Sequence, residues 1–554
     1  MTETMTVGDI TAEFLQRCGV DTAFGVISIH NIPMLDAIGR RNAIRFVMAR
    51  GEAGGGHMAD AYARVSGGLG VLITSTGPGA ANATGALVEA RFAGTPLLHL
   101  AGQTATPNID RGQGAVHDVA DQLGMLKAVS KAAYRVRSPE TALGTLARAA
   151  AEALTPPRGP ISVEIPVDIQ RASIPRPGEL DSFTLPVPPP LEPAPQALDT
   201  LADMVAAARR PLLWLGGGAR HAGAEAARLI ELGIPLVTSW NGRGVVPEDH
   251  PMTLGPLNNT PEVEAFYPSV DLLIVVGCRL RGHETRDMTL GLPPRRVQID
   301  VDPAANGRTY SCDLFLCADS APTLAGLADR IDGRLQIEPG YASEIAELKT
   351  RTTEAYRDYL DAYRTFPGDL RDAMPRDALW VRDITLNNST WGNRIFPLYG
   401  PRDSVYPVGA AIGPGLAMGI GAALAANGRK TVTMCGDGGF FLGLAELWTA
   451  VQENADVVFL VMNDRGYGVI RHIQDRMYEG RQYYGDLAGP DFEQLAALAG
   501  LPFQKVARAD QLGPAVSTAL AVDGPALVEV DMASVGPFPP YFAPPPFVDK
   551  ADKA

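Results

Sequence analysis

Two oxygen-bearing side chains follow two apolar runs of strand length in the last third of the chain. Asp437 lies in the run Gly436-Asp437-Gly438-Gly439, and Asn463 follows 26 residues later (463 − 437). That separation suits a strand–turn–helix–strand excursion that returns to the same edge of a parallel sheet. Glycines at a strand end let backbone N–H groups approach an anion, and the helix that follows directs its positive end there. Because an acidic side chain would repel a phosphate unless a divalent cation lay between them, the pattern predicts a cation–phosphate site.

The expected ligands of this site are hard oxygens, without imidazole or thiolate groups. Such a set favours Mg²⁺ or Ca²⁺ over Zn²⁺. The alternative is that residues 436–438 form a plain turn and that Asn463 is a helix cap. The glycine-rich run Arg465-Gly-Tyr-Gly directly after Asn463 favours the ligand interpretation.

Apolar runs of strand length alternate with helix-length segments along the chain, which predicts α/β domains with buried parallel strands. These runs lie at 70–76, 96–102, 211–217, 271–277, 296–302, 431–436 and 456–463. The first and last thirds share a similar unit, in which a glycine turn and one helix separate two strands. The second strand begins 19 residues after the start of the glycine turn in the first third (96 − 77) and 20 residues after it in the last third (456 − 436). We therefore expect two related domains on either side of a different middle one.

Proline-rich and charged segments divide the chain, because a run of prolines cannot lie inside a sheet or helix. We predict a first domain over 1–173, a proline-rich linker over 174–196, a central α/β domain over 197–335, a helical linker over 336–372, a last domain over 373–535 and a tail of prolines and aromatic residues over 536–554.

Composition narrows the function classes. The chain has 554 residues and a net charge of −14, which is unfavourable for binding nucleic-acid phosphates. The five cysteines lack metal-site spacing and suit reduced thiols in a cytoplasm. Neither a basic region followed by an apolar run at the N-terminus nor an apolar stretch of about 18 residues is present, so we expect no secretion signal and no membrane partner.

Several motifs in a fixed order make the chain resemble the thiamine-diphosphate (ThDP) enzymes of the acetolactate synthase, pyruvate oxidase and benzoylformate decarboxylase group. Besides the Gly-Asp-Gly and Asn pattern, they are Arg50-Gly-Glu-Ala, His57-Met-Ala-Asp-Ala-Tyr-Ala-Arg, Thr74-Ser-Thr-Gly-Pro-Gly-Ala, Gly242-Arg-Gly-Val-Val-Pro-Glu-Asp-His-Pro and Ile299-Asp-Val-Asp-Pro. The resemblance covers nearly the whole chain. It implies three doubly wound parallel-sheet domains: a first domain that binds the pyrimidine of the cofactor, a central domain, and a last domain that binds its diphosphate.

The resemblance also implies a set of site residues. Asp437, Asn463 and the backbone carbonyl of Arg465 match the family's metal ligands, and Ile412 matches the bulky residue that bends the cofactor. Glu52 matches the catalytic glutamate. The full set of implied cofactor-binding residues is Glu52, Ile412, Gly436, Asp437, Gly438, Gly439, Asn463, Arg465 and Gly466.

Glu52 has a physical reason to be catalytic in such a site. The thiazolium C2–H of ThDP is a very weak acid. A carboxyl group on the pyrimidine nitrogen stabilises the imino tautomer, whose nitrogen then removes the C2 proton. The apolar surroundings (Ala53, Gly54, Gly55, Met58) are expected to raise the pKa of this glutamate.

The resemblance implies a C–C bond lyase or ligase that acts on a 2-oxo acid. Addition of the C2 carbanion, loss of CO₂ and capture of the resulting enamine by a second carbonyl would give acetolactate synthase-like carboligation. Simple decarboxylation to an aldehyde is the alternative. Simple decarboxylases carry two adjacent histidines where this chain has single His117, and an acid where it has Val469-Ile-Arg471, so carboligation is favoured.

Departures from the acetolactate synthase pattern leave the donor open. Gly51 and Ala53 flank Glu52 where those enzymes carry histidine and glutamine. Because Gly51 has no side chain where those enzymes carry histidine, the space beside Glu52 would admit a bulkier donor. Candidate substrate contacts are His30, Gln103, His117, Asn388, Arg471 and His472.

Other features are open to more than one interpretation. The glycine cluster at 216–218 lacks the acidic residue expected about 20 positions on for a nicotinamide site and is interpreted as a structural turn. Some family members bind FAD with the middle domain, and the sequence does not decide this. The tail is an extended segment or a lid. Because Glu52 and Asp437 must hold opposite ends of one cofactor, the resemblance implies a homodimer or homotetramer with sites between subunits. A non-catalytic ThDP-binding relative and a nicotinamide oxidoreductase remain as further alternatives.

Overall fold

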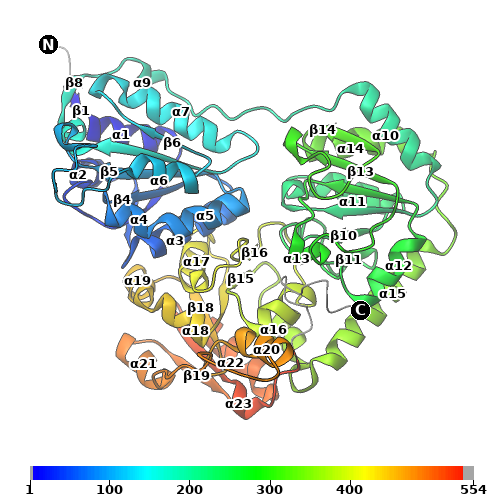
Figure 1. The fold of residues 1–554 in the computed structure, drawn as a ribbon. Coiled ribbons are helices and arrows are strands. Elements are labelled where there is room, and N and C mark those ends of the chain that lie inside the picture. Colours follow the sequence, from blue (N-terminus) through cyan, green and yellow to red (C-terminus); the bar gives the residue numbers. More distant parts are fainter. Residues whose placement is uncertain (1–3, 541–554) are drawn as a thin grey trace.

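A computed structural model describes residues 4–540 and contains three six-stranded sheets, each with all strands parallel and helices on both faces (Figure 1). The first domain lies at the upper left of Figure 1, the central domain at the upper right and the last domain below them. The prediction of three doubly wound α/β domains is confirmed. Residues 541–554 of the predicted tail lie outside the described residues.

The first sheet has the strand order β3-β2-β4-β5-β7-β6. Its strands are β2 (Thr22–Gly25), β3 (Arg45–Met48), β4 (Gly70–Thr74), β5 (Leu97–Gln103), β6 (Ala132–Arg135) and β7 (Pro160–Pro166). Its helices are α1 (Val7–Arg17), α2 (Ile32–Arg41), α3 (Glu52–Ser66), α4 (Pro78–Asn82), α5 (Thr84–Ala93), α6 (Gln122–Val129), α7 (Ala142–Leu154) and α8 (Val167–Arg171).

The last sheet has the order β16-β15-β17-β18-β20-β19. Its strands are β15 (Leu379–Arg382), β16 (Ser404–Val405), β17 (Thr431–Gly436), β18 (Val457–Asn463), β19 (Phe503–Val506) and β20 (Ala526–Asp531). Its helices are α17 (Pro414–Leu424), α18 (Asp437–Leu442), α19 (Leu447–Glu453), α20 (Gly468–Met477), α21 (Phe492–Ala499), α22 (Leu512–Leu520) and α23 (Met532–Val535). Numbered within each domain, both outer sheets have the order 2-1-3-4-6-5, so the two outer domains share one topology.

The central sheet differs, with the order β11-β10-β9-β12-β13-β14, or 3-2-1-4-5-6 within the domain. This is the strand order of dinucleotide-binding folds. Its strands are β9 (Pro211–Leu215), β10 (Leu236–Thr238), β11 (Thr253–Gly255), β12 (Leu272–Val276), β13 (Arg296–Asp300) and β14 (Leu314–Cys317). Its helices are α10 (Pro195–Ala207), α11 (Gly223–Glu231), α12 (Pro261–Phe266), α13 (Gly282–Thr285) and α14 (Ser320–Ile331).

The segments between the domains are partly ordered. The proline-rich segment begins with β8 (Ser173–Pro175), which pairs antiparallel with β1 (Thr4–Thr6), and with the short helix α9 (Glu179–Ser182). Only the following residues up to 194 run as extended chain between the first and central domains (Figure 1). Two helices, α15 (Tyr341–Tyr359) and α16 (Phe366–Ala373), connect the central and last domains. No helix within residues 4–540 combines the length and apolar character that crossing a membrane requires.

Both helices predicted after the glycine turns are broken. In the first domain the segment divides into α4 and α5, and in the last domain α18 ends before a 3-10 turn and α19. The residues 436–439 are also not a free turn, because α18 begins at Asp437 itself.

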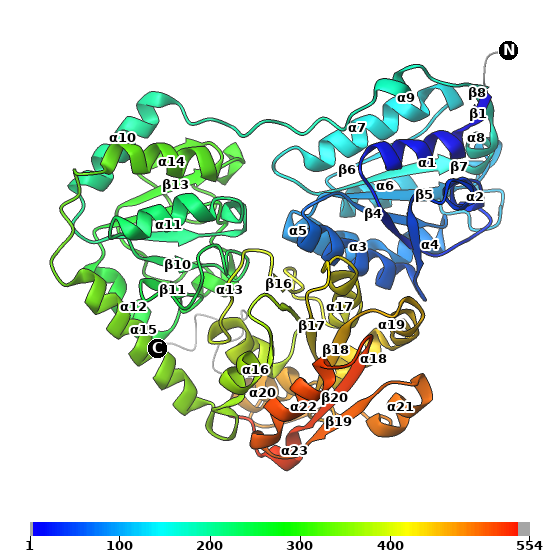
Figure 2. The same ribbon diagram turned by 180° about the vertical axis from the view of Figure 1, so that it is seen from behind.

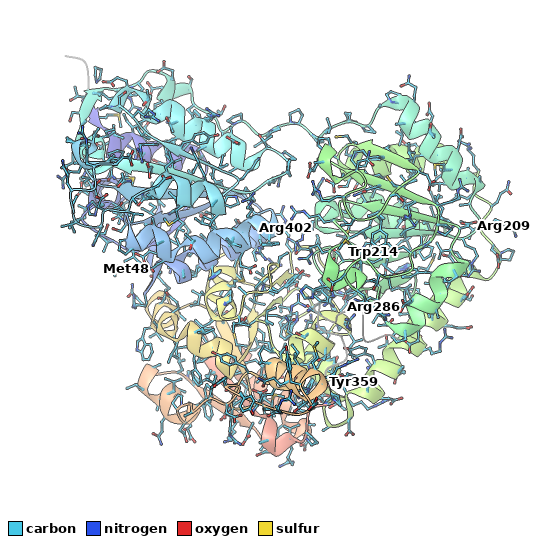
Figure 3. All side chains as sticks on the ribbon, viewed as in Figure 1. Met48, Arg209, Trp214, Arg286, Tyr359 and Arg402 are labelled. Atoms are coloured by element: carbon cyan, nitrogen blue, oxygen red, sulfur yellow. The ribbon has the colours of Figure 1, made fainter. Side chains whose placement is uncertain are left out.

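The first and last domains meet where α3 packs against α17 (Figure 2). The backbones are close enough that a Cβ at Gly421 would lie 2.2 Å from the carbonyl oxygen of Met58. At one end of this junction Arg402 donates a hydrogen bond of 2.8 Å to the Ser66 carbonyl, and Met48 marks the other end (Figure 3). The junction therefore fixes the first residues of α3 relative to the last domain.

Candidate functional site

Asp437 occupies the first position of α18, directly after β17. Its side chain is 1% exposed, and its Oδ1 atom has no hydrogen-bond partner within the described residues. The unpaired first N–H groups of a helix favour an anion at this point. A buried carboxylate oxygen without a donor indicates that a group outside the chain, such as a cation, completes the site.

The carboxyl group that lies against Asp437 belongs to Asp464, one residue beyond the predicted ligand Asn463. Asp464 comes within hydrogen-bonding reach of Asp437. The amide of Asn463 instead donates 2.7 Å to Oε1 of Glu529 and accepts 3.2 Å from the backbone N–H of Arg465. The structure thus places the carboxyl group of Asp464, and not the amide of Asn463, against Asp437, because successive side chains at a strand end face opposite ways.

The backbone carbonyl of Arg465 is also engaged elsewhere. It accepts a hydrogen bond of 3.0 Å from the N–H of Leu487, so the structure gives it a different partner from the predicted metal. Arg465 has a left-handed backbone (φ 58°), and its side chain pairs with Asp531 at 3.2 Å. The carbonyl of Gly466, one residue on, becomes the backbone candidate at this edge.

Two carboxyl groups in contact without a cation disfavour each other's charge. Burial, and then the nearby charge of Asp464, raise the pKa of Asp437 to about 7, and burial also raises the pKa of Asp464. Arg471 offsets part of this, with a 3.2 Å ion pair to Asp464. Within residues 4–540 no group of three or more His, Cys, Asp or Glu side chains is placed to bind a metal. A cation here would need further oxygens from the backbone or a bound anion.

This electrostatic arrangement predicts that Mg²⁺ affinity rises with pH. Because the pKa of Asp437 is raised, the cation must displace a proton below about pH 7, and the cation-free protein loses stability as pH rises from about 4 to about 7. We expect Mg²⁺ to bind about tenfold more weakly at pH 6 than at pH 8. Titration calorimetry at the two pH values checks this, and equal affinities would contradict the assignment.

Glu52 is the first residue of α3 and is half-buried. It accepts 3.1 Å from Nδ2 of Asn82, and a Cβ at Gly79 would lie 2.7 Å from its Oε1. These contacts all lie in the first domain, whereas Asp437 lies in the last.

Ile412 lies in the irregular segment between β16 and α17. Its side chain is 46% exposed, although its neighbours are largely held in place. Asp383, at the end of β15, accepts from the N–H groups of Gly413 (3.0 Å) and Gly415 (3.3 Å). An exposed isoleucine on a fixed backbone is suited to contact a ligand or a second chain.

Three predicted substrate contacts gather at the carboxyl ends of the first sheet. His30 is buried, its Nδ1 has no partner within the described residues, and its ring centroid lies 5.3 Å from that of the exposed His117. Burial, with the neighbouring His117, lowers the pKa of His30. Gln103 is buried and committed to Thr76 (3.0 Å) and the N–H of Thr104 (2.7 Å), which makes it a structural residue of this edge.

The other three predicted contacts lie in the last domain. Asn388 is fully buried, and neither polar atom of its amide has a partner within the described residues. Arg471 is ion-paired with Asp464 and Asp486, so it borders the carboxylate pair. His472 is half-buried, with its ring 6.4 Å from that of Phe538, and burial lowers its pKa. The six predicted contacts thus form two groups in different domains.

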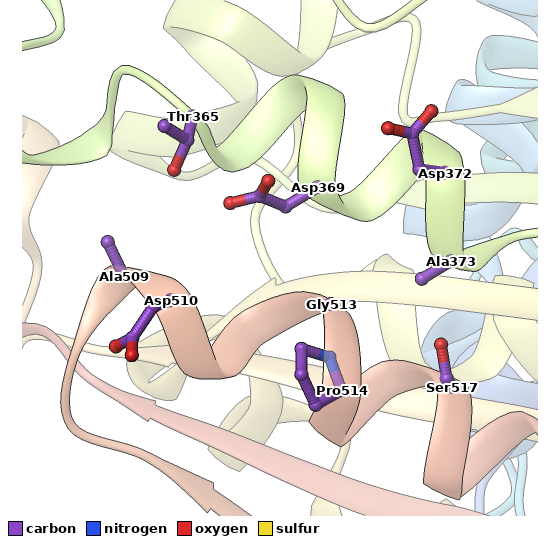
Figure 4. Close-up of a pocket in the computed structure, with 9 residues that line it drawn as sticks. All are labelled: Thr365, Asp369, Asp372, Ala373, Ala509, Asp510, Gly513, Pro514 and Ser517. Atoms are coloured by element: carbon purple, nitrogen blue, oxygen red, sulfur yellow. The ribbon is translucent and has the colours of Figure 1, made fainter.

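The central glycine cluster packs against its own chain. A Cβ at Gly216 would lie 2.1 Å from the Gly277 carbonyl, and Gly218 donates 3.0 Å to the same oxygen. The adjoining cavity has a volume of about 90 Å³. The glycines therefore allow two loops to approach, as the structural-turn interpretation expects. A larger cavity, of about 640 Å³, lies between α16 and α22 and is lined by Asp369, Asp372 and Asp510 (Figure 4). None of its lining residues is a predicted site residue.

Comparison with protein-family models decides the family. Residues 5–125 match the N-terminal binding domain of thiamine pyrophosphate enzymes, residues 198–327 match their central domain, and residues 386–530 match their C-terminal binding domain. The chain belongs to the thiamine pyrophosphate enzymes. Glu52 lies in the N-terminal match, and Ile412, Asp437 and Asp464 lie in the C-terminal match.

Curated relatives of this thiamine pyrophosphate enzyme carry two kinds of name. The "Probable 2-ketoarginine decarboxylase AruI" of Pseudomonas aeruginosa is 30% identical over 532 residues, covering 95% of this chain and 94% of that protein. The "Probable acetolactate synthase large subunit" of Methanocaldococcus jannaschii is 29% identical, covering 93% and 90%. The "Probable acetolactate synthase 2, chloroplastic" of Oryza sativa subsp. japonica is 29% identical, covering 94% and 82%. The family relationship supports an enzyme, while the relatives' names differ on the reaction.

Proposed function

We propose that this chain is a ThDP- and Mg²⁺-dependent enzyme that acts on a 2-oxo acid, with acetolactate synthase-like carboligation as the leading reaction. The observation that carries the proposal is the contact between buried Asp437 and half-buried Asp464 at the carboxyl edge of the last sheet. Two adjacent carboxylates with one unpartnered oxygen fit a hard divalent cation. In a chain that matches the thiamine pyrophosphate domains, that cation would bridge to the cofactor's diphosphate.

The residues present fit the cofactor. Asp437, Asp464 and the carbonyl of Gly466 would hold Mg²⁺, and the first N–H groups of α18 would hold the diphosphate. Ile412 would support the bent cofactor, and Glu52 would hold a proton at the pyrimidine nitrogen. When bound, ThDP supplies a carbanion-type carbon that adds to the carbonyl of a 2-oxo acid and stabilises the charge left after CO₂ departs.

Substrate selection falls to the histidine group of the first sheet. His30 is buried, its Nδ1 has no hydrogen-bond partner among residues 4–540, and its pKa is lowered. It is therefore a neutral imidazole near neutral pH whose Nδ1 can donate or accept one hydrogen bond. His117, exposed beside it, would contact the outer part of the substrate. A 2-oxo acid decarboxylase is the second candidate, favoured by the 30% identity to the relative named for 2-ketoarginine.

We propose that a second subunit completes the site. The hydrogen bond and close contacts of Glu52 lie in the first domain and the cation site lies in the last, so we propose a homodimer or homotetramer in which these residues meet across a subunit boundary. Ile412 and Leu442, 46% and 58% exposed, would lie at that boundary. Five free cysteines suit a reducing cytoplasm.

Cofactor dependence is tested by thermal unfolding. We expect saturating ThDP with Mg²⁺ to raise the Tm by about 5 °C, because a ligand at about 100 times its Kd stabilises the folded state by about 2.7 kcal/mol. EDTA should reverse the rise, and NAD should have no effect. A Tm unmoved by ThDP and Mg²⁺ would remove the proposed function.

The reaction is then assigned with the wild-type protein. Pyruvate, 2-oxobutyrate and 2-ketoarginine are incubated singly, with and without aldehyde acceptors, and products are identified by mass spectrometry. Carboligation predicts a product that contains both donor and acceptor carbons. Release of an aldehyde alone, whatever acceptor is present, would replace carboligation by the decarboxylase alternative.

A further inference from the structure

Two buried glutamates form hydrogen bonds across the junction between the first and last domains. Glu89, on α5, is 2% exposed, and Glu446, just before α19, is 4% exposed. Within residues 4–540 neither forms an ion pair with an arginine, lysine or histidine. A buried carboxylate without a counter-charge is costly unless hydrogen-bond donors satisfy it. The positions of those donors therefore indicate what the two side chains do.

Glu446 belongs to the last domain but binds the backbone that leads into Glu52. Its Oε1 accepts from the N–H groups of Arg50 and Gly51, both at 3.0 Å, and its Oε2 accepts from the hydroxyl of Thr449 at 2.7 Å. The next residue is Glu52. A Cβ at Gly54 would lie 2.1 Å from Oε1 of Glu446, so that glycine leaves room for the carboxylate.

Glu89 belongs to the first domain but binds the backbone that leads into Ile412. Its Oε2 accepts 2.7 Å from the N–H of Gly409, and its Oε1 accepts 2.9 Å from the N–H of Ala411. The next residue is Ile412. A Cβ at Gly409 would lie 2.7 Å from Oε1 of Glu89, so a glycine again leaves room for the carboxylate.

The two contacts are related by the shared topology of the outer domains. Glu89 and Glu446 both lie in the helical segment after the third strand of their sheet, β4 or β17. Each binds the segment that follows the second strand of the other sheet, β3 or β16, just before α3 or α17. Each outer domain thus holds the backbone of the residue that the other domain would present to the cofactor.

We propose that Glu89 and Glu446 are reciprocal positioning residues that fix the backbones of Ile412 and Glu52 before the cofactor binds. This inference rests on the proposed function for the roles of Ile412 and Glu52. Neither glutamate needs to touch substrate or cofactor. The backbone segments at 50–51 and 409–411 lie outside helices and strands. Charge-assisted hydrogen bonds from their N–H groups to the glutamate carboxylates hold them in place instead. Asp383 completes the arrangement at Gly413 and Gly415, so alternate N–H groups from 409 to 415 are all held by carboxylates.

The chain provides a matched control for simple domain packing. Glu453, at the end of α19, also joins the two domains, through an ion pair with Arg45 of the first domain. That pair is side chain to side chain apart from one bond to the Glu453 carbonyl, and it binds neither the 50–51 nor the 409–411 backbone. Glu453→Gln therefore removes a carboxylate from the junction without releasing either segment.

Backbone release is measured in the cofactor-free protein by hydrogen–deuterium exchange with mass spectrometry. We expect Glu446→Gln to speed exchange about tenfold in a peptide spanning 48–54 only, and Glu89→Gln to do so in a peptide spanning 407–416 only. An amide side chain keeps the shape but presents one acceptor where two are used. Glu453→Gln should leave both peptides unchanged. Unchanged exchange in the glutamine variants, or equal effects in Glu453→Gln, would overturn the proposal.

Positioning toward the cofactor is measured separately, with ThDP and Mg²⁺ bound. The rate at which bound ThDP exchanges its C2 hydrogen for deuterium should fall about tenfold or more in both glutamine variants and stay within about twofold in Glu453→Gln. Should a glutamine variant not fold, Gly54→Ala and Gly409→Ala displace the same carboxylates. ThDP binding by wild type with unchanged C2 exchange in the variants overturns the positioning role alone, whereas no ThDP binding by wild type removes the proposed function.

Discussion

Replacing Glu52 with glutamine should leave ThDP binding within about threefold of wild type and lower turnover by about 100-fold or more. The neutral amide has the same shape, so the contacts that bind the cofactor persist. It cannot hold the transferable proton that the pyrimidine nitrogen requires, and loss of a general acid–base group typically costs 10²- to 10⁴-fold. Calorimetry with ThDP and Mg²⁺ measures the first quantity, and CO₂ release from the accepted 2-oxo acid measures the second.

The control for this experiment is Glu453→Gln, which makes the same chemical change at the same domain junction. It should retain wild-type turnover, because its ion pair with Arg45 contacts no predicted site residue. Wild-type turnover in Glu52→Gln would refute the role assigned to Glu52. Loss of ThDP binding in that variant would instead make Glu52 a residue that binds the cofactor without moving its proton.

The sheets were predictable because buried parallel strands are short apolar runs, and all seven predicted runs contain strands. The relation between the outer domains was also visible, since helical segments of similar length, 22 residues (75–96) and 20 residues (437–456), separate β4 from β5 and β17 from β18. The breaks within the two helices that follow the glycine turns could not be predicted. A helix-length separation between two strands does not reveal a break such as the 3-10 turn between α18 and α19.

The oxygen-bearing side chain that lies against Asp437 was expected one residue away, at Asn463, the last residue of β18. The spacing of two strands along the chain predicts the sheet edge at which both end. It does not predict which side of the sheet a given residue faces, because that depends on where the strand ends. Asn463 and Asp464 both carry oxygen atoms, so residue type could not separate them. The Asn463 amide donates a hydrogen bond to Glu529 on β20, a partner 66 positions away in the sequence. Glu89 and Glu446 were missed for a related reason: each bonds backbone N–H groups of a distant segment, which no side-chain pattern reports.

Removing Asp464 and removing Asn463 should have opposite consequences, and this comparison decides which of them binds the cation. Asp464→Ala should weaken Mg²⁺ binding in the presence of ThDP by about 100-fold or more, since even residues that only orient a ligand are worth about 10- to 100-fold. The cation-free variant should be as stable as wild type or more so. Burial still raises the pKa of Asp437, but the added repulsion from the charge of Asp464 disappears.

Asn463→Ala should do the reverse. It leaves both carboxylates in place, so Mg²⁺ affinity should stay within about threefold of wild type. It also leaves the buried Oε1 of Glu529 without its 2.7 Å donor, which should lower the free energy of unfolding by about 1 to 3 kcal/mol. Asp464→Asn keeps one ligand oxygen and should fall between wild type and Asp464→Ala in Mg²⁺ affinity. If Asn463→Ala abolishes Mg²⁺ binding while Asp464→Ala preserves it, the cation is held as the sequence first predicted, and the carboxylate pair has another purpose.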